Sequence, residues 1–542
     1  MNPTKKLQAI PAGLLALGAL GAFQAAFVFP ALWWLVLGYL GCLFELRRLS
    51  TPRQAFYVGL VIGLGVYVPQ MRFLGDIFKA AAIPLWLILS LFHAAFLLVL
   101  NRVEVRWGGQ VASLLLPVLW CGIEYLRSEV WWLRFAWFTA GECWPPGLAP
   151  QVLQRLGIYG LGLGFAYTAG QGAMLLSATD RASRRRAGLG VSSACAVFAG
   201  VALSPSRPDP GAIQALQVAG IQLEFPALPD LLKGLDTLTR SHPEAELLML
   251  SEYSLEGPPP KALKNWCQRN RKWLVVGGKQ PIEAPAPEAM APTVMNPAIG
   301  GTNGIARATP LSASGLPWFQ PNASKERFYN TAFVISTNGE VVFQQAKSRP
   351  IQFFADGEPA PSQTVWDSPW GKLGIAICYD ASYRQVMDGL IRQGAVALLI
   401  PTMDVEQWGA HEHQLNARMA VIRAAEYRVP IFRVASSGIS QIIDQNGHEA
   451  VTAPFPGQGE SLAGTLELRS SGGSIPPDAW LAPVCMTATG AVLLGLGIGA
   501  WRDRRATRPP HGNPTGASLP GQPMDSAGSP CKDSSVGTSE EA

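Results

Sequence analysis

Three polar residues in the second half of the chain each follow a short run that is expected to form a strand, in the order acid, amine and thiol. Glu252 comes after ELLMLS, Lys347 after VVFQQA, and Cys378 after GIAI. In layered α/β sheets the carboxyl ends of strands open onto a crevice, where functional groups gather. These three side chains are therefore candidates for one shared site.

A thiol, a carboxylate and an ammonium can together perform acyl transfer. An unperturbed thiol, with a pKa of about 8.5, is mostly protonated at neutral pH. Glu252 can take its proton, and Lys347 can favour the thiolate and later the oxyanion of a tetrahedral intermediate. Each residue alone also has a structural explanation: a helix N-terminal carboxylate, a solvated edge-strand lysine and a buried core cysteine.

Residues 205–480 contain the elements that must position these groups. Short β-rich runs alternate there with helices expected near 228–241, 260–271, 382–393 and 411–427, and Asn338-Gly339 forms the turn of a hairpin. This alternation favours an α/β domain with a layered sheet. Residues 283–326, rich in Pro, Ala and Gly, are expected to form a long exposed loop.

Residues 1–204 are far more apolar. The 542-residue chain is 48% hydrophobic and 15% charged, which is too apolar for an ordinary soluble protein. About seven membrane spans are expected in residues 1–204 by the ~20-residue criterion. They lie near 10–29, 31–46, 54–69, 80–100, 110–127, 155–177 and 187–204, and a further span lies at 481–501. Residues 502–542, rich in Pro, Gly and Ser, are expected to be a disordered tail.

Clusters of Lys and Arg predict how the chain crosses the membrane. When eight spans are threaded alternately, every cluster falls on one side: Lys5-Lys6, Arg47-Arg48-Arg53, Arg102-Arg106, Arg181 with Arg184–Arg186, and Arg502 with Arg504-Arg505. That side is expected to be the cytoplasm, with both termini there. The loop 128–154 and residues 205–480 then lie outside.

The charge and the cysteines narrow the function classes. The net charge of +5 comes largely from the clusters beside the spans. We therefore interpret it as a signal for the orientation of the spans in the membrane, and we expect no nucleic-acid partner. The eight Cys are scattered, without a CxxC pair, which supports neither a disulfide framework nor a zinc site. We therefore expect no cofactor and no metal.

The order Glu, Lys, Cys and the neighbours of each residue resemble the carbon–nitrogen hydrolase (nitrilase) superfamily. The matching stretches are LSEYSLEG, the hairpin beginning YNTA, GIAICYD, and ARMAVIRAAEYRVPIFRVASSG, which fits that family's R-A-x-E helix before two closing strands. In the apolar half, WCGIEYLRS, LRFAW and QRLGIYGLG resemble the W-x-x-x-E-x-x-R, F-x-W and G-x-Y-G segments of the apolipoprotein N-acyltransferase family. The resemblance covers most of residues 10–500.

This resemblance implies a multi-pass α-helical membrane domain plus an α/β nitrilase-like α-β-β-α sandwich domain. It implies a monomer in the bacterial inner membrane that moves an acyl chain from a phospholipid to the N-terminal amine of a diacylglyceryl apolipoprotein. Cys378 would carry the chain as a thioester, Glu252 would be the general base and Lys347 the oxyanion stabiliser. The backbone N–H of Tyr379 would help to shape the oxyanion site.

The chain departs from the family pattern after Lys347 and again after Cys378. The family usually has P-F-G-E after its Lys, whereas KSRPIQFFADGEPAP offers Asp356 and Glu358. Glu358 is our first candidate for the second site acid and Asp356 the alternative, and either could be a solvated loop acid. Asp380 stands where the family often has Glu.

Two other functions compete with acyl transfer to a lipoprotein. The first is a membrane-tethered amidase with the same triad, which the departures after Lys347 favour. The apolar spans and four tryptophans of the outer loop favour a lipid substrate, because Trp prefers the membrane interface: Trp131, Trp132, Trp137 and Trp144.

The second competing function is ligand binding by a membrane protein whose nitrilase-like domain is inactive. A transporter should carry ionisable residues within its spans. His93, Glu124 and Arg127 lie in or at the ends of the expected spans. Glu124 and Arg127 are three residues apart and can pair on one helix face, for structure or around a lipid headgroup.

Overall fold

The computed structural model describes residues 6–205, 213–282, 327–352, 354–457 and 459–506. The expected loop 283–326 and residues 507–542 of the expected tail lie outside the described residues. Residues 502–506 belong to helix α12 (Asp478–Ala506), so the start of the expected tail is helical. Met1–Leu496 form one compact unit and Gly497–Ala542 a second. Every contact described below lies within the first unit.

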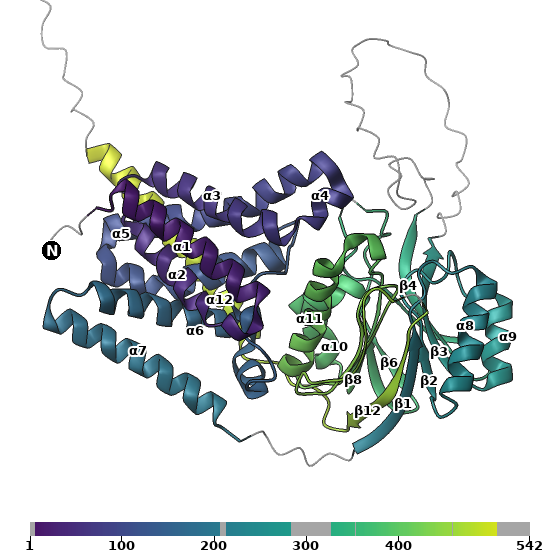
Figure 1. The fold of residues 1–542 in the computed structure, drawn as a ribbon. Coiled ribbons are helices and arrows are strands. Elements are labelled where there is room, and N and C mark those ends of the chain that lie inside the picture. Colours follow the sequence, from purple (N-terminus) through teal and green to yellow (C-terminus); the bar gives the residue numbers. More distant parts are fainter. Residues whose placement is uncertain (1–5, 206–212, 283–326, 353, 458, 507–542) are drawn as a thin grey trace, which may run out of the picture. The chain divides into compact units, whose positions relative to one another are not determined.

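The N-terminal part is built from helices (Figure 1). They are α1 (Ala9–Val28), α2 (Leu35–Glu45), α3 (Pro52–Gln70), α4 (Phe73–Phe78), α5 (Ala82–Tyr125), α6 (Pro150–Ser177) and α7 (Arg181–Ala202). Gly108, with φ 82°, breaks the helical path of α5, and Gly157, with φ 69°, breaks that of α6. The break at Gly108 lies between the expected spans 80–100 and 110–127.

Three helical stretches of the described residues are long and apolar enough to cross a membrane: Ala9–Val28, Phe73–Val130 and Asp478–Arg505. The 58 residues of the second stretch contain two of the expected spans. Helices α3, α6 and α7 coincide with other expected spans without reaching the same apolar character. Helix α2, at 11 residues, is shorter than a bilayer core requires. The chain is a membrane protein with three candidate spans.

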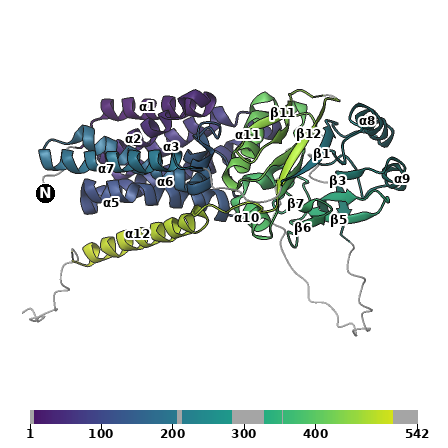
Figure 2. The ribbon, with the colours of Figure 1, turned by 90° about the horizontal axis from the view of Figure 1, so that it is seen from below.

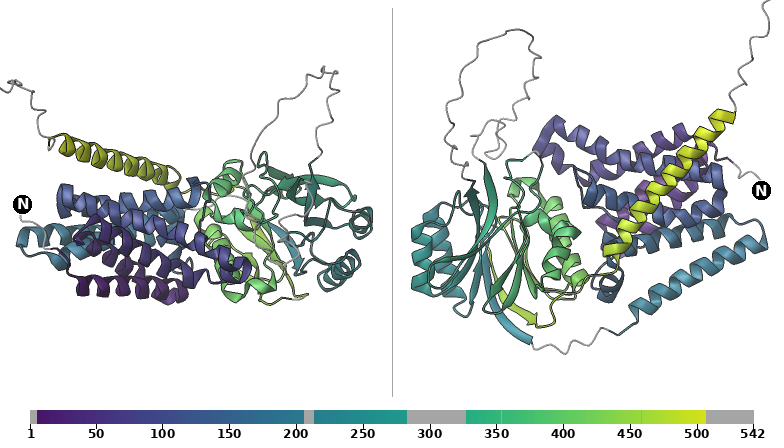
Figure 3. Two further views of the ribbon diagram at one scale, coloured as in Figure 1. Left: turned by 90° about the horizontal axis from the view of Figure 1, so that it is seen from above. Right: turned by 180° about the vertical axis from the view of Figure 1, so that it is seen from behind.

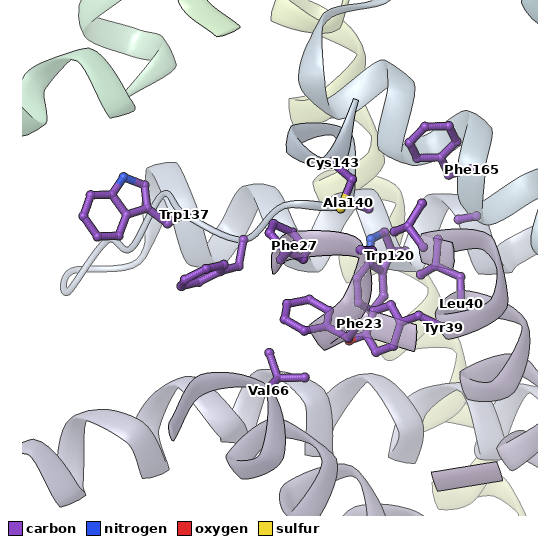
Figure 4. Close-up of a cluster of buried hydrophobic side chains, with 14 of the residues drawn as sticks. Phe23, Phe27, Tyr39, Leu40, Val66, Trp120, Trp137, Ala140, Cys143 and Phe165 are labelled. Carbon is purple, nitrogen blue, oxygen red and sulfur yellow. The ribbon is translucent and has the colours of Figure 1, made fainter. Parts of the chain in front are cut away.

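Aromatic and aliphatic side chains fill the space between these helices (Figure 4). Tyr39 of α2 meets Phe23 of α1 and Trp120 of α5 edge to face, with ring centroids 5.1 and 5.8 Å apart. Trp137, from the segment that follows α5, is buried in the same cluster. The hydrophobic core between the helices therefore also anchors the segment that follows α5.

The second half is a sandwich of two six-stranded sheets. The first has the order β12-β1-β2-β3-β4-β5 and the second β11-β10-β9-β8-β7-β6. The strands of the first are β1 (Ile213–Ile221), β2 (Leu247–Met249), β3 (Trp273–Pro281), β4 (Phe328–Ile335), β5 (Val341–Ala346) and β12 (Ser461–Arg469). Those of the second are β6 (Val365–Ser368), β7 (Gly371–Ile375), β8 (Ala397–Thr402), β9 (Ile431–Ala435), β10 (Ser440–Ile443) and β11 (Glu449–Ala453).

Two helices cover the outer face of each sheet (Figures 1, 2 and 3). Helices α8 (Leu228–Ser241) and α9 (Lys261–Asn270) pack on the first sheet, and α10 (Arg384–Arg392) and α11 (Ala410–Tyr427) on the second. Apolar side chains from both sheets fill the layer between them, including Leu216, Leu247, Leu373, Leu399 and Phe432. This confirms the predicted α-β-β-α sandwich.

Candidate active site

Lys347 lies between two carboxylates. Its ammonium is 2.8 Å from Oε1 of Glu252 and 2.8 Å from Oδ2 of Asp356, and all three side chains are buried. Lys347 directly follows β5, and its backbone N–H donates to the carbonyl of Asn330 on β4, so the hairpin fixes its position. Burial opposes the charge of Lys347, but Asp356 and Glu252 outweigh it and hold its pKa well above the usual value.

The structure places Asp356, rather than the preferred Glu358, at this ammonium. Asp356 also accepts hydrogen bonds from the backbone N–H of Ile351 (2.6 Å) and from the hydroxyl of Tyr253 (2.8 Å). Glu358 is exposed and pairs with Arg327 at 3.0 Å. The choice depends on Gly357, whose φ of 83° and close approach to the backbone of β4 turn the chain between the two acids.

Glu252 is held by three donors. Its Oε1 accepts from Lys347 and from Nδ2 of Asn330 (2.5 Å), and its Oε2 accepts from the backbone N–H of Met403 (2.8 Å). Burial raises the pKa of Glu252, the charge of Lys347 opposes this rise, and Asp356 adds to it. Glu252 is therefore a stronger base than an exposed carboxylate.

Asn330 was not predicted as a site residue. Its amide donates both to Glu252 and to Oδ1 of Asp356 (2.8 Å), so one side chain aligns the two carboxylates. The sequence signal was a polar residue within the otherwise apolar strand FYNTAFVI, at a buried position. A buried amide on a core strand requires polar partners.

Cys378 lies at a sharp turn between β7 and the short helix Cys378–Ser382. Its φ of 51° is in the left-handed region, which is uncommon for a residue other than Gly. The Sγ atom is 3.8 Å from the carbonyl of Met403 and 4.0 Å from Nδ2 of Asn416. Because Met403 contacts Glu252 through its N–H and Cys378 through its carbonyl, the carboxylate of Glu252 and the thiol are neighbours.

The thiol is protonated at neutral pH in this environment. Burial raises the pKa of Cys378 well above its usual value, the negative charge of Glu252 adds to this, and Lys347 opposes it. A nucleophilic role therefore requires that the proton be removed as the thiol reacts.

Asp380 connects the segment after Lys347 to the residues around Cys378 through hydrogen bonds. Its carboxylate accepts from the backbone N–H groups of Ser348 (2.9 Å), Arg349 (2.7 Å) and Ile377 (3.3 Å). Burial raises its pKa to about 6, and the charge of Lys347 opposes this rise. Asp380 thus joins the segment after Lys347 to the turn at Cys378.

Tyr379 faces the segment that follows α5. Its hydroxyl accepts a hydrogen bond from the backbone N–H of Ala136 at 3.1 Å, and its side chain lines the cavity at Cys378. The predicted use of the Tyr379 backbone N–H at an oxyanion stays a prediction.

An apolar cavity of about 430 Å³ opens at Cys378. One wall is made by α4 and α5 through Phe73, Leu74, Ile77, Phe78, Leu85 and Leu89. The other walls come from the segment after α5, from the segment after Lys347 and from residues near α11. They are Leu133, Arg134, Phe135 and Trp137, then Ser348–Gln352, Phe354, Gly357 and Pro359, and finally Trp408, Glu412 and Asn416. A concave apolar site with a few polar groups at its reactive end is the usual form of a ligand site.

Glu124 and Arg127 form no ion pair with each other in the described part of the chain. Glu124 instead accepts from the backbone N–H of Ala140 (2.8 Å), and Arg127 donates to the carbonyl of Trp137 (2.8 Å) and to the hydroxyl of Tyr67. Both residues therefore shape the segment that forms one wall of the cavity. In that segment Trp131 and Trp132 are exposed, whereas Trp137 and Trp144 are buried.

One group of side chains has ligand atoms close enough for a metal ion. Atoms of Asp404, Glu412 and His413 lie within 4.8 Å of one another, all buried. Arg433 already pairs with Asp404 and, against the effect of burial, keeps the pKa of that carboxyl below its usual value. A metal ion there would have to displace this guanidinium.

Comparisons with known proteins match both halves of the chain. A family described as "Apolipoprotein N-acyltransferase N-terminal domain" matches residues 18–171, and one described as "Carbon-nitrogen hydrolase" matches residues 299–463. A relative in Geobacter metallireducens, named apolipoprotein N-acyltransferase, is 24% identical over 439 residues, which are 73% of this chain and 78% of the relative. A relative of the same name in Sinorhizobium fredii is 26% identical over 497 residues, 80% of this chain and 85% of the relative.

Among solved structures, the chain is similar to Saccharomyces cerevisiae Nit3, described as a member of branch 10 of the nitrilase superfamily. The TM-score is 0.34 at 19% identity, and the match covers 49% of this chain and 93% of that chain.

Proposed function

Because the chain belongs to the apolipoprotein N-acyltransferase family, we propose that it moves an acyl chain from a phospholipid to the N-terminal amine of a diacylglyceryl apolipoprotein. The observation that carries this proposal is the setting of Cys378. The thiol lies beside Glu252 and opens onto a cavity with apolar walls from α4 and α5. Burial against such walls stabilises a bound acyl chain by about 0.8 kcal/mol per CH₂, a gain that a small amide lacks.

In the first half of the reaction, Glu252 takes the thiol proton as Sγ of Cys378 attacks the ester carbonyl. The C–S bond forms, the ester C–O bond breaks, and the lysophospholipid oxygen leaves with the proton from Glu252. Lys347 has three N–H donors, of which two are used by Glu252 and Asp356. The third is available to the oxyanion of the tetrahedral intermediate.

In the second half, the acceptor amine attacks the thioester. The C–N bond forms and the C–S bond breaks, while Glu252 takes a proton from the nitrogen and returns it to sulfur. An N-terminal amine has a pKa of about 7.7–8.0, so a substantial fraction is neutral and nucleophilic near pH 7. Asn330 and Asp356 keep Glu252 and Lys347 in register through both halves.

The same proposal places the enzyme in a bacterial inner membrane as a monomer. Residues 1–204 and 481–501 would span the bilayer, and residues 205–480 would lie on the extracytoplasmic side with both termini in the cytoplasm. The distribution of Lys and Arg clusters supports this orientation. The exposed Trp131 and Trp132 would then mark the outer interface.

Acylation of Cys378 tests the mechanism directly. The purified full-length protein is incubated with a phospholipid labelled in its acyl chain, and a hydroxylamine-sensitive adduct is sought. We expect the adduct in the parent and in Cys195→Ala, which changes an exposed cysteine of α7, and not in Cys378→Ala.

An adduct that persists in Cys378→Ala, or none in the parent, would contradict the acyltransferase mechanism. A thioester that passes its chain to water but never to a diacylglyceryl peptide would favour an amidase-like hydrolase.

A further inference from the structure

Two arginines line the cavity that contains Cys378. They are Arg134, in the segment after α5, and Arg349, two residues after Lys347. Neither forms an ion pair with a carboxylate of the described residues, and Arg349 has one side-chain hydrogen bond among them, to Oε1 of Gln385 at 3.0 Å. The Nε atoms of both arginines are buried and lack a hydrogen-bond partner in the same part of the chain. Buried donors of this kind require an acceptor.

The two guanidinium groups are close enough to repel each other. Burial lowers the pKa of Arg134 and the positive charge of Arg349 lowers it further, while Tyr383 and Glu129 oppose this shift without outweighing it. The carboxyl of Glu412 in the same cavity does not offset this charge, because burial raises its pKa well above the usual value. The carboxylate of Asp380 is occupied by backbone N–H groups. The cavity is therefore lined by two guanidinium groups that form no ion pair with a carboxylate of the residues that the structure describes.

Both arginines are held in place by residues that closely follow Cys378. The backbone N–H of Arg349 donates to Asp380 at 2.7 Å, and the carbonyl of Arg134 accepts from the hydroxyl of Tyr383 at 3.1 Å. The side chain of Gln352 donates to the carbonyl of Trp132 at 2.5 Å, which joins the two arginine-bearing segments. The spacing between the guanidinium pair and the thiol is thus set by the fold.

The neighbours of the pair indicate the kind of anion. Trp131 and Trp132 are 39% and 59% exposed just before Arg134, and exposed tryptophans lie at the headgroup level of a bilayer. Behind the arginines the cavity walls are apolar. The expected ligand therefore carries a compact anion at one end and hydrocarbon at the other.

We propose that Arg134 and Arg349 bind the phosphodiester of a glycerophospholipid acyl donor while its ester reaches Cys378. Paired guanidinium groups suit phosphate oxygens, because each presents several N–H donors in a planar fork. The inference rests on the proposed acyl transfer and goes further. The diacylglyceryl acceptor has no phosphate, so the pair serves the donor and acts in the first half of the reaction.

The test compares two acyl donors with identical chains, phosphatidylglycerol and diacylglycerol, in detergent micelles. Thioester formation is measured for the full-length parent, Arg134→Gln, Arg349→Gln and the double variant. The control Arg240→Gln removes a guanidinium from α8, on the outer face of the first sheet. We expect KM for phosphatidylglycerol to rise about tenfold for each arginine, as the loss of one charge-assisted hydrogen bond predicts, with kcat within about twofold. The rate with diacylglycerol and the behaviour of Arg240→Gln should not change.

Equal losses with both donors, or no loss with either, would overturn the headgroup site and leave acyl transfer intact. If the parent forms no thioester from either donor, the result contradicts the proposed function instead. The headgroup site is then tested by measuring lipid binding. Native mass spectrometry of Cys378→Ala should show phosphatidylglycerol retained over diacylglycerol, and the two arginine substitutions should remove that preference. Equal retention of the two lipids overturns the proposal. In that case inorganic phosphate is added and its ³¹P NMR signal is recorded; broadening that requires both arginines would show that the pair binds free phosphate.

Discussion

Lys347, Glu252 and Asp356 are mutually dependent because one ammonium is the ion-pair partner of two buried carboxylates. With Asn330 bonded to both acids, each side chain fixes the position of the others. Removing one partner of a buried ion pair costs more than the pair contributes, since the remaining charge stays desolvated. At this scale the response to substitution should therefore differ sharply between Asp356 and the nearby acid Glu358.

We predict that Asp356→Asn slows thioester formation by about 100-fold, the size of effect seen when an electrostatic stabiliser is lost. The amide cannot balance Lys347, so the ammonium turns towards Glu252 and away from the oxyanion. Glu358→Gln is the matched control and should stay within about twofold, because Glu358 is exposed and pairs with Arg327. Rates are compared after thermal unfolding has shown both variants to be folded. A larger effect from Glu358→Gln would restore that acid as the site residue.

The raised pKa of Glu252 predicts the pH dependence of the Cys378 thiol. Glu252 acts as a base only when ionised, and burial raises its pKa above the usual 4.5. Alkylation of Cys378 by iodoacetamide should therefore fall as pH decreases through a value above 4.5, and Glu252→Gln should slow alkylation about 100-fold across the range. The modification is followed by mass spectrometry. Alkylation of Glu252→Gln at the parent rate would show that the thiol needs no base.

At the scale of elements, the local sequence pattern predicted the helices, because each helix is determined by residues close together in the sequence. Helix α8 occupies the predicted 228–241, and α9 lies within the predicted 260–271, because each has one apolar face on the first sheet. Strand β12 was not predicted. It pairs with β1, whose residues lie about two hundred and fifty positions earlier, and such pairing leaves no local signal in the sequence.

The site follows the same division. The positions of Glu252, Lys347 and Cys378 at the ends of expected strands were visible in the sequence, and the structure brings them together. The inward turn of Asp356 depends on Gly357 packing against β4, and the position of Arg134 depends on a segment from the other half of the chain. Both positions depend on packing between residues far apart in the sequence, so they cannot be predicted from the periodicity of apolar residues.

We predict that Arg127→Met loosens the segment between α5 and α6. The substitution leaves the buried carbonyl of Trp137 without its donor, a loss of about 1–3 kcal/mol in unfolding free energy. Thioester formation should also slow, because Ala136 in this segment donates to Tyr379. Arg102→Gln changes an exposed arginine of the same helix and should behave as the parent. Thermal unfolding and limited proteolysis between residues 128 and 149 measure the effect; unchanged protease resistance would contradict it.

At the scale of the whole molecule, one buried residue joins three distant parts of the chain. Asp478, the first residue of α12, pairs with Arg384 of α10 and accepts from the backbone N–H of Tyr159 in α6 at 3.0 Å. Gly157 makes this possible, since a Cβ there would lie 2.0 Å from the carboxyl group of Asp478. The last helix is therefore attached to both the helical half and the sandwich.

We predict that Asp478→Ala destabilises the entire protein. Arg384 would keep Asp388 and Glu426 as ion-pair partners but lose Asp478, and the buried backbone N–H of Tyr159 would lose its acceptor, at a cost of about 1–3 kcal/mol. Size-exclusion chromatography of the heated, detergent-solubilised protein should show earlier aggregation than for the parent. Thr487→Ala, on an exposed position of the same helix, should not change the profile. Equal thermal behaviour of Asp478→Ala and the parent would show that α12 contributes little to assembly.

The left-handed backbone at Cys378 sets activity against stability at a single position. Glycine adopts a φ of 51° freely, whereas any side chain there is strained by about 1 kcal/mol or more. Cys378→Gly should therefore unfold at a higher temperature than Cys378→Ala, although both lack the thiol. If Cys378 carries the proposed acyl transfer, a library selected for heat resistance alone would accumulate glycine at residue 378 and lose that activity. The cysteine then persists only while the activity is itself under selection.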